Sequence, residues 1–200
     1  MTRKCIILTG LAAAIICSAN VFALDIGDSM PAVDAKLKGI DGKEPELGSL
    51  KGEKGTLIVF TCVHCPVVEA LQERMVALGN EYAKKGIGVV FVNSNDPGKY
   101  ASDGIEGMRR QAKKQGYEFP YLVDETSDIA RKFGAKRTPE LFLFDADGEL
   151  VYHGTVDDSP RDAGKVSKRY LKNALEAVLE GDEVPVKTTR AIGCSIKFRS

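Results

Sequence analysis

Residues 56–66 read TLIVFTCVHCP, and this stretch decides the fold. Residues 56–61 are a short run of apolar and β-branched side chains, which is typical of a strand buried on both faces. Pro66 suits the first turn of a helix, where its missing N–H is not needed. After it, apolar side chains recur at the spacing of one helix face, at Val68, Leu71, Met75, Leu78 and Tyr82. The stretch therefore predicts a strand that passes through two cysteines directly into a helix.

The flanking sequence continues this alternation of strands and helices. Turn residues at Asp41-Gly42 between 33–37 and 45–47 predict a hairpin. Asp103 with Glu106 and, later, Ser167 are the expected N-caps of two helices. Further strands are expected at 89–92, 120–123, 140–144 and 150–154, and helices at 103–115, 127–133 and from 167 onward. This order predicts an α/β fold in which strands 56–61 and 89–92 are parallel and joined by a helical crossover.

Composition narrows the classes of function. The chain has 200 residues with 28 basic and 28 acidic side chains and no tryptophan. Such a balanced charge lacks the basic surface with which nucleic-acid-binding proteins hold phosphates. We therefore expect no nucleic-acid partner, and chemistry on small molecules or proteins remains.

The N-terminus has the pattern of an export signal. Arg3 and Lys4 precede an apolar run at 5–17, and Ala23 offers a small residue for cleavage. The run is shorter than the about 20 residues that cross a bilayer. We expect a cleaved signal peptide at 1–23, a domain at 24–180 and a tail at 181–200. The mature protein is then periplasmic or secreted and free of the membrane; an uncleaved N-terminal anchor is the alternative.

The mature chain keeps three cysteines, Cys62, Cys65 and Cys194. On the first turn of a helix, Cys62 and Cys65 share a face, and the positive end of the helix dipole stabilises a thiolate. We expect Cys62 to attack and Cys65 to resolve the mixed disulfide. A purely structural bond is less consistent with the spacing, because so small a ring stabilises a fold by only about 2 kcal/mol. A metal site needs more ligands than one pair offers.

Five further residues are candidates near the pair. His64, when protonated, favours a Cys62 thiolate, although an exposed and uncoupled His is the simpler interpretation. Thr138-Pro139 precedes a strand, and in this topology Pro139 is a candidate cis-proline whose preceding residue offers backbone groups to a peptide. By sequence alone, an ordinary trans proline at the start of a strand is the commoner alternative. Glu140 is either a proton-transfer group or a solvated carboxylate at a strand edge. Cys194 is either a third redox cysteine, a site of pairing between chains or an inert buried thiol.

Together these motifs resemble the thioredoxin superfamily. The hairpin near Gly42 and the layer at 93–133 resemble its redoxin branch, and a peroxiredoxin-like group of exported proteins in particular. The matching segments are 60–66, 92–96, 119–126 and 192–197. The resemblance implies a thioredoxin-like fold with an N-terminal β-hairpin and a central αβα-type insertion. It also implies an enzyme that uses its cysteines and needs no cofactor.

The sequence departs from the patterns of this superfamily in three respects, at Thr61 and Thr56. Peroxiredoxins carry a Thr three residues before the peroxide-reacting Cys, whereas Thr61 lies four before Cys65 and adjacent to Cys62. Thr61 also replaces the aromatic residue that precedes the pair in thioredoxins, and Thr56 stands where a thioredoxin places a buried Asp.

These departures weigh against peroxide chemistry. We therefore expect a thiol–disulfide oxidoreductase whose partners are protein thiols and disulfides and a further redox protein. A thiol peroxidase acting on peroxide is the first alternative. A copper or zinc carrier using Cys62, Cys65 and a His, or a redox-inactive binding module, is the second.

Overall fold

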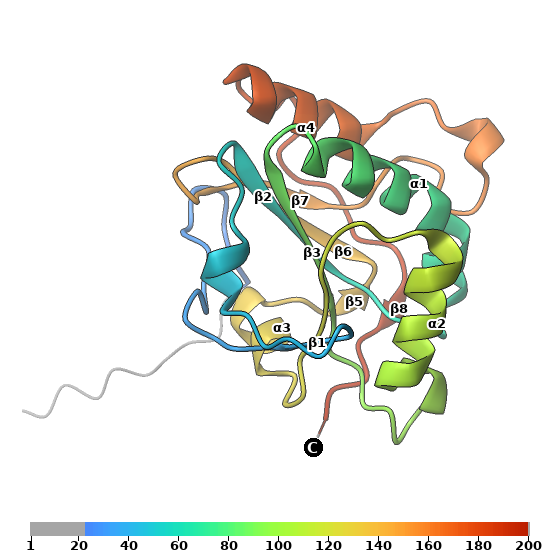
Figure 1. Cartoon of the computed structure of the whole chain (residues 1–200). Helices are drawn as coiled ribbons and strands as arrows, with labels where there is room; N and C mark the ends of the chain where they lie inside the picture. The colour runs from blue at the N-terminus through green and yellow to red at the C-terminus, as the bar shows by residue number, and fades with distance from the viewer. Residues whose placement is uncertain (1–22, 200) are drawn as a thin grey trace, which may run out of the picture.

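The computed structural model describes residues 23–199, so the expected signal peptide lies outside them except for Ala23. A mixed six-stranded sheet forms the centre of the molecule (Figure 1), in the order β1-β4-β3-β2-β6-β7. Its strands are β1 (Lys38–Gly39), β2 (Gly55–Phe60), β3 (Ile87–Asn93), β4 (Tyr121–Val123), β6 (Glu140–Phe144) and β7 (Leu150–Gly154). A separate two-stranded sheet pairs β5 (Arg137–Thr138) with β8 (Cys194–Ser195).

Strand β2 is fixed from both sides in the middle of the sheet. It runs parallel to β3 and antiparallel to β6, with Phe60 opposite Val92 and Glu140. All six of its residues are buried, as the apolar run predicted. The end of β2 is therefore held in place where the chain enters the cysteine motif.

Four helices cover the two faces of the sheet. They are α1 (Pro66–Ala83), α2 (Ile105–Gln115), α3 (Asp128–Phe133) and α4 (Tyr170–Glu180), and short 3-10 turns occupy Leu47–Leu50, Ala101–Asp103 and Ala163–Lys165. Buried side chains of α1, α2 and α4 form one apolar cluster, and those of α3 and the N-terminal segment form a second. Within residues 23–199, no helix is long and apolar enough to cross a membrane.

The thioredoxin-like fold expected from the sequence is confirmed. Helix α1 connects the parallel strands β2 and β3, and α2, β4 and α3 form the insertion before β6. The N-terminal hairpin is present in a loose form: it turns at Gly42, and Lys36 pairs with Glu46 outside the named strands.

Two expected helix caps are wrong. Helix α2 begins after Gly104 and has no side-chain cap, because the Asp103 carboxylate points toward residues 63–64 instead. Helix α4 begins after Arg169, and the Ser167 hydroxyl hydrogen-bonds to Asp158. In both cases the side chain expected to cap the helix forms its hydrogen bonds elsewhere: Asp103 with residues 63–64, and Ser167 with Asp158.

The C-terminal segment, which showed no periodicity in the sequence, folds back onto the domain. After α4 it crosses the molecule to β8, which lies beside β5 near the start of α1 (Figure 1). Ile196 is buried in the second apolar cluster. The tail is therefore part of the packed structure around the cysteine motif.

Candidate active site

The cysteine motif straddles the start of α1 instead of lying inside its first turn. The helix begins at Pro66, so Cys65 is its N-cap residue and Cys62 lies in the loop that follows β2. The Thr61 amide donates to the Val92 carbonyl at 2.9 Å, which extends the strand pairing into this loop. The expectation that both cysteines share the first helical turn is wrong, and only Cys65 lies at the positive end of the helix.

Thr138 brings the two cysteines together from the other side. The peptide bond between Thr138 and Pro139 is cis, as predicted. The Cys62 Sγ lies 3.2 Å from the Thr138 hydroxyl, and the Cys65 Sγ lies 3.3 Å from the Thr138 carbonyl oxygen. Both cysteine side chains are fully buried.

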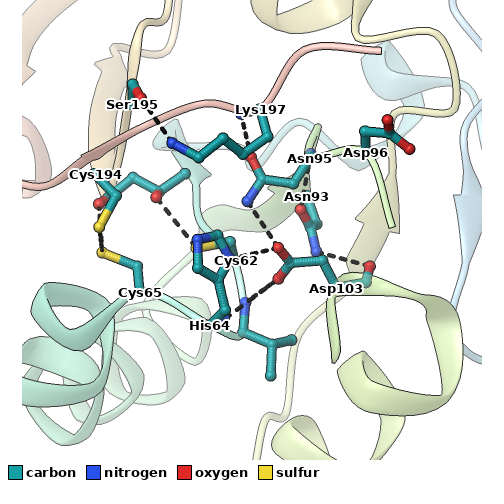
Figure 2. A network of polar contacts seen from close by, with 12 residues as sticks. Cys62, His64, Cys65, Asn93, Asn95, Asp96, Asp103, Cys194, Ser195 and Lys197 are labelled. Carbon is teal, nitrogen blue, oxygen red and sulfur yellow. Dashed lines mark hydrogen bonds and ion pairs between the residues drawn. The ribbon is translucent and has the colours of Figure 1, made fainter. Parts of the chain in front are cut away.

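Cys194 completes a cluster of three free thiols. Its Sγ lies 2.9 Å from the Cys65 Sγ, and Figure 2 shows the two sulfurs pointing toward each other. Cys194 is only half-buried, and its strand covers Cys65. Cys194 is therefore in direct contact with the cysteine pair.

The three thiols differ in acidity. Interaction with the Cys62 thiol, together with the Cys194 thiol and backbone amides of Val68 and Cys194, lowers the pKa of Cys65 to about 4 against the effect of burial. Interaction with the Cys65 sulfur, and then burial, raises the pKa of Cys62. Burial, followed by the Cys65 sulfur, raises the pKa of Cys194 to about 11. The environment thus lowers the pKa of Cys65 and raises that of Cys62, whereas the sequence led us to expect Cys62 as the more acidic cysteine.

Asp103 is a central residue of the site that the sequence did not indicate. Its buried carboxylate accepts hydrogen bonds from the Val63 amide at 2.7 Å, from His64 Nδ1 at 2.6 Å and from Asn95 Nδ2 at 2.9 Å. Figure 2 shows these contacts converging on one side chain. Asp103 thus fixes the loop between the cysteines, whereas its sequence context indicated only a helix cap.

His64 is held within this network, with a ring nitrogen within 4.8 Å of the Cys62 sulfur. Besides its bond to Asp103, its ring stacks on Tyr100, with centroids 3.7 Å apart. Its Nε2 is buried and has no hydrogen-bond partner among the described residues. Asp103 contributes to raising the pKa of Cys62, so the predicted stabilisation of a Cys62 thiolate through His64 is opposed by the carboxylate beside it.

Glu140 is a structural support for the segment that carries Thr138. It is buried, so the interpretation as a solvated carboxylate is wrong. Its Oε2 accepts from the amides of Lys136 at 2.7 Å and Arg137 at 2.8 Å, and its Oε1 lies 2.8 Å from His153 Nε2. Burial alone raises the pKa of Glu140, but these hydrogen bonds outweigh it and the pKa is lowered.

One group of side chains could supply metal ligands. Single ligand atoms of Cys62, His64 and Asp103 all lie within 4.8 Å of one another. The Asp103 oxygens already accept hydrogen bonds from backbone and side-chain donors, and three ligands are fewer than the four of a structural zinc site. Among the described residues, this arrangement fits a hydrogen-bonded positioning network better than a complete metal site.

A comparison with known protein families identifies the family of this chain. A model of the Redoxin family matches residues 25–170, which is most of the chain. The chain belongs to the Redoxin family. The family match ends before the tail, so it covers Cys62, Cys65 and Thr138 but not Cys194.

Individual relatives are moderately similar. An uncharacterized conserved protein from Geobacillus kaustophilus is 40% identical, with a TM-score of 0.82 over 88% of this chain and 93% of that one. A hypothetical protein from Sinorhizobium meliloti is 34% identical, with the same TM-score over 90% and 97% of the two chains. A protein named thiol-disulfide oxidoreductase ResA, from Halalkalibacterium halodurans, is 28% identical over 60% of this chain and 64% of that relative.

The Asp103 network predicts a specific loss of order at the cysteine loop. In Asp103→Asn, one of the two acceptor oxygens becomes an NH2 group, so either the Val63 amide or the His64 ring loses its acceptor, and we expect the unfolding free energy to fall by about 1–3 kcal/mol. Chemical denaturation measures this loss. Asp96→Asn is the matched control, because the Asp96 carboxylate bonds only to the exposed Gly98 amide. Equal effects of the two substitutions would contradict a special role for Asp103.

The Glu140 contacts predict a pH-dependent contribution to stability. The pKa of Glu140 is lower in the folded protein than its usual value of about 4.3, so its contribution is present above that value and is lost as the pH falls through the folded pKa. Glu140→Gln, with one acceptor oxygen for three donors, should cost about 1–3 kcal/mol at neutral pH. The difference from wild type should shrink in acid.

Thermal or denaturant unfolding between neutral pH and pH 3 tests this prediction. The exposed Glu125→Gln serves as the control and should show no such trend. A difference between wild type and Glu140→Gln that is constant with pH would refute the role assigned to the carboxylate.

Proposed function

We propose that this protein is a thiol–disulfide oxidoreductase that exchanges disulfides with protein substrates outside the cytoplasm. The observation that carries the proposal is the position of Cys65 at the N-cap of α1, where its pKa is lowered to about 4, with Cys62 beside it across Thr138. A thiolate with a second cysteine within reach is what disulfide exchange requires. The curated relatives named ResA support the same activity.

The order of the two cysteines follows from their environments. The Cys65 thiolate attacks one sulfur of a substrate disulfide, a new S–S bond forms, and the other substrate sulfur leaves as a thiolate. A second protein thiol then loses its proton and attacks Cys65 Sγ, which releases the reduced substrate and leaves a disulfide in the protein. Cys62 is positioned for this second step, the reverse of the order expected from the sequence.

The state of Cys65 affects how easily Cys62 ionises for the second step. The largest cause of the raised pKa of Cys62 is its interaction with the Cys65 sulfur. Once Cys65 is in a mixed disulfide, its charge is gone and that cause is removed. Cys62 therefore becomes easier to ionise at the stage when its thiolate is needed.

Thiol peroxidase, the alternative that the family permits, gains no support from the site. The Thr61 hydroxyl has no hydrogen-bond partner within residues 23–199, and Cys62 occupies the position three residues before Cys65. Peroxide reduction therefore serves as the contrasting outcome in the test below.

The activity test compares substitutions at Cys65 and at a distant exposed site. Reduction of insulin disulfides by the reduced protein should fall by more than about 100-fold in Cys65→Ser, since the attacking thiolate is lost. Thr126→Ser, exposed and remote from the cysteines, should match wild type. Alkylation of Cys65 in the wild-type protein should reach its plateau above about pH 5, as its lowered pKa requires. Unchanged insulin reduction in Cys65→Ser, or oxidation by peroxide faster than by disulfides, would overturn the proposal.

The location outside the cytoplasm rests on the N-terminal pattern and has its own test. The protein recovered from the periplasm or medium should begin at Leu24 by mass spectrometry, because the segment before it has the pattern of a cleavable signal. A variant lacking residues 2–23 should stay in the cytoplasm. An intact N-terminus found only in the cytoplasmic fraction would contradict export.

A further inference from the structure

The C-terminal segment at 193–197 lies across the cysteine motif. Strand β8 pairs antiparallel with β5, with Cys194 opposite Thr138 and Ser195 opposite Arg137. The Ile196 amide donates to the Lys136 carbonyl at 2.9 Å, and the Ile196 side chain is buried. The backbone just before Pro139, which a thioredoxin-like fold can offer to a peptide, is therefore occupied by the protein's own tail.

The opposite edge of the same segment is also anchored. The Lys197 amide donates to Asn95 Oδ1 at 2.8 Å, and the Lys197 carbonyl accepts from the Asp96 amide at 2.7 Å. Asn95 in turn donates to Asp103, which holds the loop between Cys62 and Cys65 (Figure 2). The tail and the cysteine loop thus share one hydrogen-bond network.

Gly193 is the residue that lets the tail come this close. A Cβ atom at this position would lie 2.0 Å from the Thr138 carbonyl oxygen, which is backbone and cannot move aside cheaply. Any larger residue therefore pushes the strand away from β5. The closeness of the tail to Thr138 depends on this one position.

This docking places Cys194 directly on Cys65. The two Sγ atoms lie 2.9 Å apart, within about 1 Å of the length of a disulfide bond. The docked strand holds the Cys194 sulfur against that of Cys65, which is fully buried. A substrate disulfide can therefore react with Cys65 only when the structure around it opens.

We propose that Cys194 is a resolving cysteine of this protein, and that the tail at 193–197 acts as a built-in peptide substrate for Cys65. This inference rests on the proposed disulfide exchange. A substrate disulfide reacts with the Cys65 thiolate to give a mixed disulfide and one substrate thiolate. The returning tail brings the Cys194 thiol, which loses its proton to solvent and attacks Cys65 Sγ. The Cys65–Cys194 disulfide forms and the second substrate thiolate leaves. The protein has then lost the two electrons that the substrate disulfide gains.

The test isolates this step in protein that lacks Cys62. Reduced Cys62→Ser that lacks residues 1–23, and with them Cys5 and Cys17, is mixed with one equivalent of dithiobis(nitrobenzoate), a small disulfide whose released thiol is coloured. Cys65 releases the first thionitrobenzoate and keeps the other in a mixed disulfide, which Cys194 then expels. We expect two released equivalents per chain, a monomer without free thiols, and a Cys65–Cys194 link in the peptide map.

Two further variants separate docking from the mere presence of a thiol. The double variant Cys62→Ser/Cys194→Ser should release one equivalent and keep the mixed disulfide. Gly193→Ala in the Cys62→Ser background retains both thiols but displaces the tail, so the second release should slow by at least about tenfold, because exchange within a chain depends on positioning. Gly164→Ala in the same background is the control, since its Cβ would meet only the Asp162 side chain at 3.3 Å.

The outcomes distinguish this inference from the proposed function. One released equivalent from Cys62→Ser with a persistent mixed disulfide, or a link between chains instead of within one, overturns the role of Cys194 even if insulin reduction is normal. An equal second release in Gly193→Ala and Gly164→Ala overturns the role of the docked tail. Two equivalents with a mapped Cys65–Cys194 link support the inference even if insulin is not reduced, because this measurement needs no protein substrate.

Discussion

Thr138 is the contact on which the whole site depends, because it touches all three cysteines with different atoms. Its hydroxyl lies against Cys62, its carbonyl oxygen against Cys65, and its backbone pairs with Cys194. Glu140 holds Lys136 and Arg137, the two residues before Thr138, through hydrogen bonds from their amides. The strand β6 that follows is locked antiparallel to β2, the strand that leads into the cysteine motif. The central sheet thus sets the spacing between Thr138 and the start of α1.

A second constraint acts on the loop between the cysteines. Asp103 reaches it from the turn before α2 and accepts hydrogen bonds from backbone, His64 and Asn95. Buried acceptors with several donors are costly to leave unsatisfied, so such a network has few alternative arrangements. Asn95 also accepts a hydrogen bond from the Lys197 amide of the tail. The tail is thus linked through Asn95 and Asp103 to the loop that carries Cys62.

The sequence predicted those features that local pattern determines. The strands at 140–144 and 150–154 have the expected bounds, since apolar runs and a turn define them within a few residues. The cis bond before Pro139 followed from element order. Contacts over long separations were not predictable: Asp103 lies 40 positions from Val63, and Cys194 lies 129 from Cys65. Cys62 lies outside the first turn of α1 because the Val92 carbonyl and Asp103 hold residues 61–64 in a loop.

Two properties bear on whether Cys65 forms its disulfide with Cys62 or with Cys194: the size of the ring that each disulfide closes, and the docking of the tail. In an unfolded chain, closing the small ring of Cys62 and Cys65 costs about 2 kcal/mol of chain entropy, against about 5 kcal/mol for the long loop to Cys194. In the folded protein the domain between Cys65 and the tail already closes most of the long loop. The hydrogen bonds at Ile196, Lys197 and Asp96, at about 0.5–1.5 kcal/mol each, and the burial of Ile196 hold the rest in place. Cys62 and Cys194 thus both lie near Cys65 in the folded protein, so the position of the tail bears on which disulfide forms.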